Sequence, residues 1–158
     1  MIPTIEDVKA AAKRIEGIAV KTPLIRNDVL DEITGAKVWV KAENLQRGGA
    51  FKMRGATNAI SALEPEVRAK GVIAFSSGNH AIAVATASKI FGIKATIVMP
   101  ADAPKIKLDT TRSLGATVVT YDRVGESRQL GLSARTTMSD LSLIKPFEYP
   151  FVLAGQGT

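Results

Sequence analysis

Residues 71–100 read GVIAFSSGNHAIAVATASKIFGIKATIVMP, and this pattern predicts one class of fold. A short apolar run over 72–75 is followed by a polar turn and a helical pattern over 79–91. That pattern ends at Gly92, a typical C-terminal helix cap. A second apolar run over 95–99 stops at Pro100. A strand, a helix and a strand joined by short loops form a βαβ unit, in which the two strands are parallel.

The alternation of strands and helices continues on both sides of this unit. Thr4 to Asp7 resembles a capping box and starts a first helix that is expected to run to about Glu16. The remaining predicted elements are a strand at 38–43, a helix at 52–63, a helix at 104–114, a strand at 116–121, a weaker helix at 126–138 and a strand at 141–144. Near the end of the chain, Gly155 and Gly157 predict a turn. We therefore predict an α/β fold, a parallel sheet with flanking helices.

Composition excludes several classes of protein. The 158 residues are enough for one domain with a core, and none is cysteine, which excludes disulfides, thiolate metal sites and a cysteine nucleophile. The lack of cysteine fits a reducing cytoplasm. The N-terminal sequence shows no signal peptide, and no apolar stretch is long enough to span a membrane. We therefore expect a cytoplasmic protein.

The net charge of +6 leaves two interpretations open. Binding to nucleic acid is disfavoured, because lysines and arginines are scattered along the chain and only eight residues are aromatic. An anionic small molecule and an ordinary solvated surface both remain compatible with the charge.

Residues 48–56, GGAFKMRGA, place Lys52 where a helix is predicted to begin. A lysine that does chemistry needs a neutral amine, and both partial burial and a nearby positive charge lower its pKa. The helix start supplies the positive end of a dipole, and Arg54 is expected to add a charge. The spacing differs from that of a nucleotide-binding P-loop, since Met53 stands where a Ser or Thr is required.

The turn Ser76-Ser77-Gly78-Asn79-His80 follows a predicted strand and opens a predicted helix. Backbone N–H groups at such a turn bind carboxylates, and parallel sheets bind ligands at the carboxyl ends of their strands. The alternative is an ordinary strand-to-helix cap with Asn79 as N-cap. His80 is the only histidine, so we predict no metal site and a structural or secondary role for this side chain.

These residues resemble a known family of enzymes. The stretches at 43–58, 76–81 and 154–158 are similar, in order and spacing, to those of the threonine dehydratase and serine racemase family. That family belongs to the fold type II, tryptophan-synthase-β-like pyridoxal-phosphate enzymes, whose cofactor domain is a three-layer αβα structure. The resemblance covers essentially the whole chain.

The resemblance implies a role for each matching residue. Lys52 would carry pyridoxal 5'-phosphate as a Schiff base and act as general base, with Phe51 against the cofactor ring. Asn79 would bond the ring's 3-hydroxyl oxygen. The turn from Ser76 to His80 (Ser76, Ser77, Gly78, Asn79 and His80) would hold the substrate carboxylate. Ser77 aligns with a serine that acts, in racemases, on the face opposite the lysine.

The resemblance also implies a domain organisation. Residues 1–47 would start a large cofactor domain, 48–146 would form a small βαβ domain, and 147–158 would return to the large domain. The glycine-rich loop for the cofactor phosphate would follow Thr158, so we expect a chain truncated before the second half of the large domain. Apolar surface is then expected to be exposed along the first and last segments.

The implied activity is deamination of a hydroxy amino acid, threonine or serine, by β-elimination to a 2-oxo acid and ammonia. The full-length enzyme would be a homo-oligomer. Serine racemase and 3-hydroxyaspartate dehydratase remain alternatives within the family. An inactive pseudoenzyme or interaction fragment is the alternative of another class.

Overall fold

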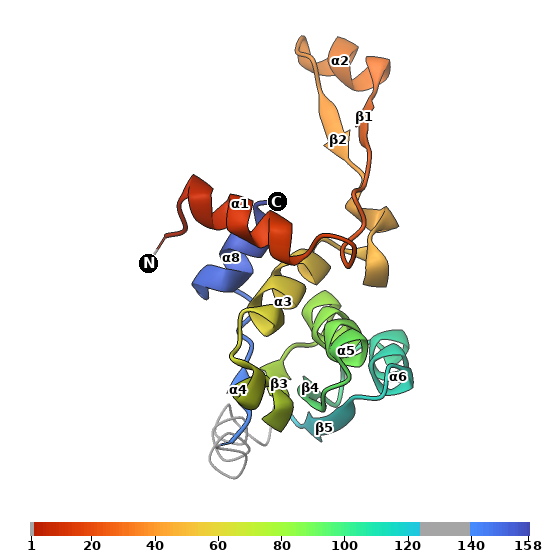
Figure 1. Ribbon diagram of the computed structural model, residues 1–158. Coiled ribbons are helices and arrows are strands. Elements are labelled where there is room, and N and C mark those ends of the chain that lie inside the picture. Colours follow the sequence, from red (N-terminus) through yellow and green to blue (C-terminus); the bar gives the residue numbers. More distant parts are fainter. Residues whose placement is uncertain (1, 124–139) are drawn as a thin grey trace.

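The computed structural model describes residues 2–123 and 140–158 (Figure 1). Helix α1 (Ile5–Arg14) begins with the predicted capping box: the Thr4 hydroxyl accepts from the Asp7 N–H, and the Asp7 carboxylate accepts from the Thr4 N–H. Acidic residues lie in its first turn and basic residues in its last, which complements the helix dipole.

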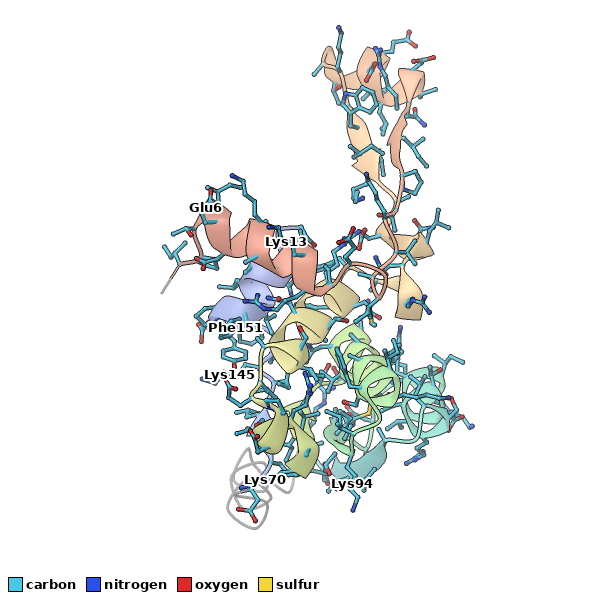
Figure 2. All side chains as sticks on the ribbon, viewed as in Figure 1. Glu6, Lys13, Lys70, Lys94, Lys145 and Phe151 are labelled. Atoms are coloured by element: carbon cyan, nitrogen blue, oxygen red, sulfur yellow. The ribbon has the colours of Figure 1, made fainter. Side chains whose placement is uncertain are left out.

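An arm of three short elements follows α1 and projects from the rest of the molecule (Figure 1). It consists of β1 (Leu24–Arg26), α2 (Asp28–Thr34) and β2 (Trp39–Lys41), with β1 and β2 antiparallel. The strand at β2 was predicted, and α2 was not. Several apolar side chains of the arm are exposed. Figure 2 shows the side chains of the arm as a whole standing away from the other elements. The exposed apolar residues are Leu24, Ile25, Val29, Ile33, Trp39 and Val40. Exposed apolar surface in the first segment was expected.

A four-stranded parallel sheet forms the centre of the fold. Its strands are β3 (Val72–Phe75), β4 (Ala95–Pro100), β5 (Thr117–Tyr121) and β6 (Ser142–Leu143), in the order β5-β4-β3-β6. All three pairings are parallel. The α/β class with a parallel sheet and flanking helices is thereby confirmed. The predicted helix at 126–138 lies outside the described residues.

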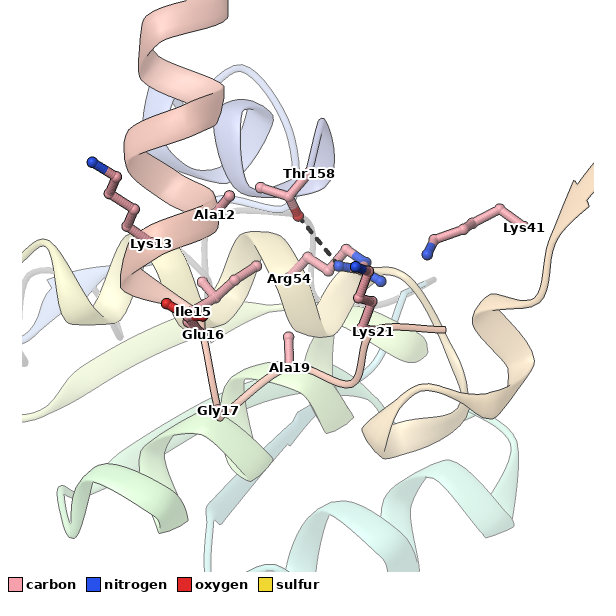
Figure 3. Close-up of a pocket in the computed structure, with 10 residues that line it drawn as sticks. All are labelled: Ala12, Lys13, Ile15, Glu16, Gly17, Ala19, Lys21, Lys41, Arg54 and Thr158. Carbon is pink, nitrogen blue, oxygen red and sulfur yellow. Dashed lines mark hydrogen bonds between the residues drawn. The ribbon is translucent and has the colours of Figure 1, made fainter. Parts of the chain in front are cut away.

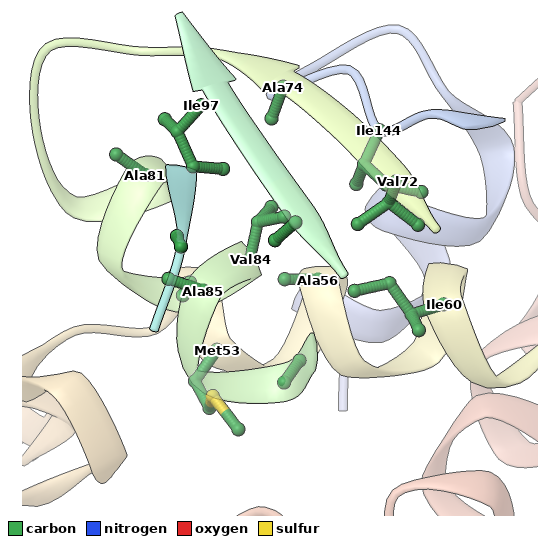
Figure 4. Packing of buried hydrophobic residues seen from close by; sticks show 14 of the residues in the cluster. Met53, Ala56, Ile60, Val72, Ala74, Ala81, Val84, Ala85, Ile97 and Ile144 are labelled. Atoms are coloured by element: carbon green, nitrogen blue, oxygen red, sulfur yellow. The ribbon is translucent and has the colours of Figure 1, made fainter. Parts of the chain in front are cut away.

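Helices and short turns surround the sheet. They are the 3-10 turns η1 (Glu43–Leu45) and η2 (Arg47–Gly49), and the helices α3 (Lys52–Ser61), α4 (Pro65–Lys70), α5 (Asn79–Phe91), α6 (Lys105–Ser113) and α8 (Pro150–Gln156). The predicted bounds of α5 are confirmed. Apolar side chains of α3, α5, β3 and β4 form one core, which includes Met53, Ile60, Val84 and Ile97 (Figure 4).

The C-terminal segment differs from the prediction of a glycine-prepared turn. It is helix α8, and its glycine serves packing against α3. A Cβ added at Gly155 would lie 2.6 Å from the carbonyl oxygen of Arg54, and one at Gly55 would lie 2.7 Å from that of Val152. The two backbones approach so closely that neither position has room for a side chain. The domain boundaries at 47 and 146 stay a prediction.

Candidate functional site

Lys52 is the first residue of α3, as predicted, and its side chain is partly buried. Its Nζ donates a hydrogen bond to the carbonyl oxygen of Pro146, at 2.9 Å. The same nitrogen lies 5.1 Å from the centroid of the Phe51 ring, which is 44% exposed. Burial lowers the pKa of Lys52 below its ordinary value of 10.5, so more of the amine is neutral near physiological pH.

Arg54 does not contribute to this shift, and the prediction that it adds a charge beside Lys52 is wrong. Its guanidinium is paired instead with Glu43, through Nη2 to Oε1 at 2.7 Å and Nε to Oε2 at 2.9 Å. Burial raises the pKa of Glu43, but hydrogen bonds from Arg54 and Thr22 outweigh burial, and the net pKa is lowered. Residues two positions apart on a helix do not face each other, so Lys52 and Arg54 point toward different parts of the molecule.

The turn from Ser76 to His80 connects β3 to α5 at the carboxyl edge of the sheet. The Ser76 hydroxyl accepts from the Gly78 N–H at 3.2 Å, which shapes the turn. The N–H groups of Asn79 and His80 precede the first intrahelical bond of α5, from the Ile82 N–H to the Gly78 carbonyl. Such N–H groups at a helix start can donate to an anion. Ser77 and Asn79 are exposed at this edge.

The alternative interpretation of this turn, an ordinary cap, required Asn79 to be the N-cap of α5, and it is not. Gly78 occupies that position, and Asn79 is the first helical residue. Its Oδ1 accepts from Lys107 Nζ of α6 at 2.7 Å. A lysine ammonium only donates, so the carbonyl side of the Asn79 amide faces Lys107 and the NH₂ group is left to donate elsewhere.

His80 is buried, with 3% of its surface exposed. Its Nε2 lies 2.9 Å from the carbonyl oxygen of Ile144. Because a carbonyl only accepts, Nε2 carries the proton. Burial is the main cause that lowers the pKa of His80 below 6.5; the bond to Ile144 opposes this and the charge of Lys52 reinforces it. The ring is therefore neutral at neutral pH, and its Nδ1 has no hydrogen-bond partner among the described residues.

A pocket of about 580 Å³ lies elsewhere, between α1, the chain that follows it and the last residue (Figure 3). Its lining includes Lys13, Lys21, Lys41, Arg54 and Thr158, and none of the predicted site residues. The guanidinium of Arg54 is already neutralised by its ion pair with Glu43. The pocket's cationic rim alone does not define a ligand, and we place the candidate site at the sheet edge.

Two features are absent from the part of the chain that the structure describes, a metal site and a membrane-spanning helix. No group of three side chains suited to a metal ion occurs there. Among the same residues, no helix has both the length and the apolar character needed to cross a bilayer.

Comparison with known proteins now decides the family. The family described as "Pyridoxal-phosphate dependent enzyme" matches residues 15–158. The chain belongs to this family of pyridoxal-phosphate-dependent enzymes. The resemblance inferred from the lysine and Ser-Gly-Asn-His motifs is thus confirmed.

Individual relatives of this pyridoxal-phosphate family are also similar. The chain is 50% identical over 152 residues to the L-threo-3-hydroxyaspartate ammonia-lyase of a Pseudomonas species, covering 96% of this chain and 48% of that protein. It is 43% identical over 155 residues to the L-threonine ammonia-lyase of Thermotoga maritima, with 98% and 39% covered. The chain spans about half the length, or less, of these curated relatives.

A solved member of the family has the same fold over its matching half. The crystal structure of serine racemase from Dictyostelium discoideum superposes with a TM-score of 0.90 at 42% identity, covering 97% of this chain and 50% of that one. The arm, the parallel sheet and the site edge therefore belong to a shared architecture.

Sequence reasoning missed three partners within the site. The carbonyls of Ile144 and Pro146 receive hydrogen bonds from His80 and Lys52, and Lys107 bonds Asn79. A backbone carbonyl has no residue-type signal, and Lys107 is 28 positions from Asn79. A signal was available for the two carbonyls, because Ile144 ends the predicted last strand and Pro146 follows it, and the carboxyl end of that strand meets the same sheet edge.

Proposed function

We propose that this chain supplies the reactive lysine and the carboxylate-binding turn of a pyridoxal-phosphate-dependent ammonia-lyase. The reaction would convert a β-hydroxy amino acid to a 2-oxo acid and ammonia. The observation that carries the proposal is the meeting of Lys52 and the start of α5 at one sheet edge. There, Lys52 and His80 bond carbonyls only two residues apart.

The residues at this edge fit the cofactor. Lys52 offers an amine whose pKa burial lowers, and the exposed Phe51 ring beside it offers an apolar face. Asn79 has its NH₂ group left to donate, as a phenolate oxygen requires. We propose that Lys52 holds the cofactor, that Phe51 lies against the ring and that Asn79 donates to the ring's 3-hydroxyl oxygen. The phosphate-binding loop stays a prediction for sequence after Thr158.

The bound cofactor supplies an electron sink for the pair released when the substrate Cα–H bond breaks. The chain's own part is proton transfer and orientation. Lys52 Nζ, when neutral, takes the Cα proton, and its lowered pKa increases the neutral fraction. The β-hydroxyl would leave as water with the proton that Lys52 Nζ took up, and hydrolysis of the released enamine by one water molecule would give the 2-oxo acid and ammonia.

The substrate carboxylate would be bound by the turn. Backbone N–H groups of Asn79 and His80 point out of the start of α5, where the helix dipole favours an anion. The hydroxyls of Ser76 and Ser77 and the unobstructed backbone of Gly78, which has no atom within 4 Å of an added Cβ, complete the cradle. Orientation by such fixed donors contributes to catalysis because it costs no reorganisation during the reaction.

Racemisation of serine is the second candidate. Ser77 is exposed at the sheet edge, and in this reaction its hydroxyl would transfer a proton on the substrate face opposite Lys52. The solved relative from Dictyostelium discoideum is a serine racemase. Dehydration of 3-hydroxyaspartate is a further choice of substrate within the first proposal, and the similar Pseudomonas protein bears that name. Homo-oligomerisation stays a prediction.

Turnover by the polypeptide that carries this chain tests the proposal. L-threonine, L-serine and L-threo-3-hydroxyaspartate are supplied in turn with pyridoxal phosphate, and 2-oxo acid, ammonia and D-serine are measured. We expect 2-oxo acid and ammonia in equal amounts, and loss of both in Lys52→Ala. D-serine as the main product would favour the racemase. No product from any of the three, with Lys52→Ala indistinguishable from the wild type, would favour the inactive fragment.

A further inference from the structure

The connection that follows β6 is held by two site side chains at positions two residues apart. His80 Nε2 donates to the carbonyl of Ile144 at 2.9 Å, and Lys52 Nζ donates to the carbonyl of Pro146, also at 2.9 Å. We call residues 144–146 the strap. His80 comes from α5 and Lys52 from α3, so the strap joins the starts of both helices.

Both backbone polar groups of Ile144, the first residue of the strap, are hydrogen-bonded. The Ile144 N–H donates to the carbonyl of Ile73 in β3 at 2.9 Å, and its own carbonyl accepts from His80. Its side chain is fully buried in the core. Pro146, in contrast, has no N–H to donate and a φ limited by its ring. The position of the Pro146 carbonyl therefore depends on how firmly Ile144 is held.

The ring of His80 is suited to holding the Ile144 carbonyl. Its ring is buried and neutral, and Nε2–H is the group that meets the strap. The charged group that acts on its pKa is Lys52, which bonds the same strap. Nδ1 is buried without a partner within residues 2–123 and 140–158, so protonation there would leave a buried charge and the ring is not a ready proton carrier.

We propose that His80 is a positioning residue for Lys52: by holding the Ile144 carbonyl, it fixes the strap whose Pro146 carbonyl holds the lysine amine at the sheet edge. The inference rests on the proposed function only in treating Lys52 as the reacting amine. With the strap fixed, the amine stays oriented and shielded from water. With the strap released, water reaches Nζ and the main cause of its lowered pKa weakens.

Two amide variants of the same chain test the role. In His80→Gln the side-chain NH₂ reaches the place of Nε2 and can still donate to Ile144. In His80→Asn the amide is one methylene shorter and cannot. Ser88→Ala is the control, since it also removes a buried polar group from α5 and the Ser88 side chain makes no hydrogen bond to any residue that the structure describes. Circular dichroism shows which variants fold.

Two measurements are made without cofactor. Trace labelling with acetic anhydride, followed by mass spectrometry, gives the reactivity of Lys52 against pH, with exposed Lys9 as internal reference. Hydrogen exchange gives the protection of the Ile144 N–H. In His80→Asn we expect the pKa of Lys52 to rise, its labelling at pH 8 to fall by about threefold, equivalent to about half a pKa unit, and Ile144 to exchange faster. His80→Gln and Ser88→Ala should resemble the wild type.

Other results would overturn the proposal. These are wild-type behaviour in His80→Asn, equal changes in the Asn and Gln variants, or a similar change in Ser88→Ala. If His80→Asn does not fold, nitrogen NMR of the wild-type ring decides: a proton on Nε2 and none on Nδ1 at neutral pH supports the proposal, and the reverse overturns it. Since no readout uses cofactor, failure here is separate from failure of the proposed activity.

Discussion

Arg54 and Glu43 form a two-bond ion pair that ties α3 to the turn before it, with both side chains mostly buried, at 8% and 16% exposure. The same guanidinium bonds the carbonyl of Val20 and the hydroxyl of Thr22. The pair thus joins three segments: α3, the turn η1 and residues 20–22.

Removing one member of this pair should cost more than removing both. Glu43→Leu leaves the buried Arg54 charge uncompensated, and we expect it to lower the free energy of unfolding by about 3 kcal/mol. Glu43→Leu combined with Arg54→Leu should recover part of that loss. Urea unfolding of both single variants and the double variant measures the coupling. A double variant that loses the full sum of the single losses would show that the two side chains act independently.

Substitution of either glycine at the α3–α8 contact should be destabilising. Gly→Ala within a helix ordinarily stabilises by up to about 1 kcal/mol, because alanine has the higher helix propensity. At Gly55 and Gly155 an added Cβ would lie 2.7 and 2.6 Å from a backbone carbonyl oxygen, so the helices must move apart. We expect Gly55→Ala and Gly155→Ala each to lose about 2 kcal/mol in urea unfolding. A gain in stability at either position would contradict the close packing.

The contact between α3 and α8 illustrates which elements could be predicted from the sequence and which could not. The strand-turn-helix over 72–91 was predicted because apolar periodicity, the polar turn and Gly92 all favour the same elements. Gly155 and Gly157 predict a turn, because glycine normally disfavours helix, but the segment is helix α8. The packing that favours Gly155 comes from α3, which is distant in the sequence. Tertiary contact overrode local propensity there.

The same distinction applies to the site. Lys52 and the turn at 76–80 were found from residue types that suit their chemistry. The direction of Arg54 was missed, since its partner Glu43 lies 11 residues earlier and competes with any interaction near Lys52. The strap was missed because its acceptors are backbone atoms, 64 and 94 positions from the side chains that bond them.

Stability should depend on pH through His80. Its folded-state pKa is below the unfolded value of about 6.5, so the unfolded state binds a proton that the folded state resists. The stability that depends on a neutral His80 is therefore fully present above pH 6.5. It is lost as the pH falls through 6.5 toward the folded-state pKa. Urea midpoints at pH 7.5 and 5.5 measure it, with His80→Gln as the control that cannot titrate. Since His80 is the only histidine, equal pH dependence in the two proteins would refute the assignment.

Lys107 should support cofactor binding indirectly through Asn79. Its Nζ holds the amide oxygen of Asn79, which leaves the NH₂ group to donate. Lys107→Met should weaken pyridoxal-phosphate binding by about threefold, since one exposed hydrogen bond contributes less than about 1 kcal/mol. Spectroscopic titration with cofactor gives the affinity, and Lys105→Met is a neighbouring control whose amine bonds Asp109 instead. Equal loss in both variants would indicate a general charge effect.

The most direct test of the account is covalent attachment of the cofactor at residue 52. The purified chain is mixed with pyridoxal phosphate, its visible absorption spectrum is recorded, and the sample is reduced with borohydride and mapped by mass spectrometry beside Lys52→Ala. We predict a visible band in the wild type, fixed by reduction on Lys52, and no such band in the variant. No band, or equal labelling of wild type and variant at other lysines, would contradict the assignment of Lys52 as the reactive amine.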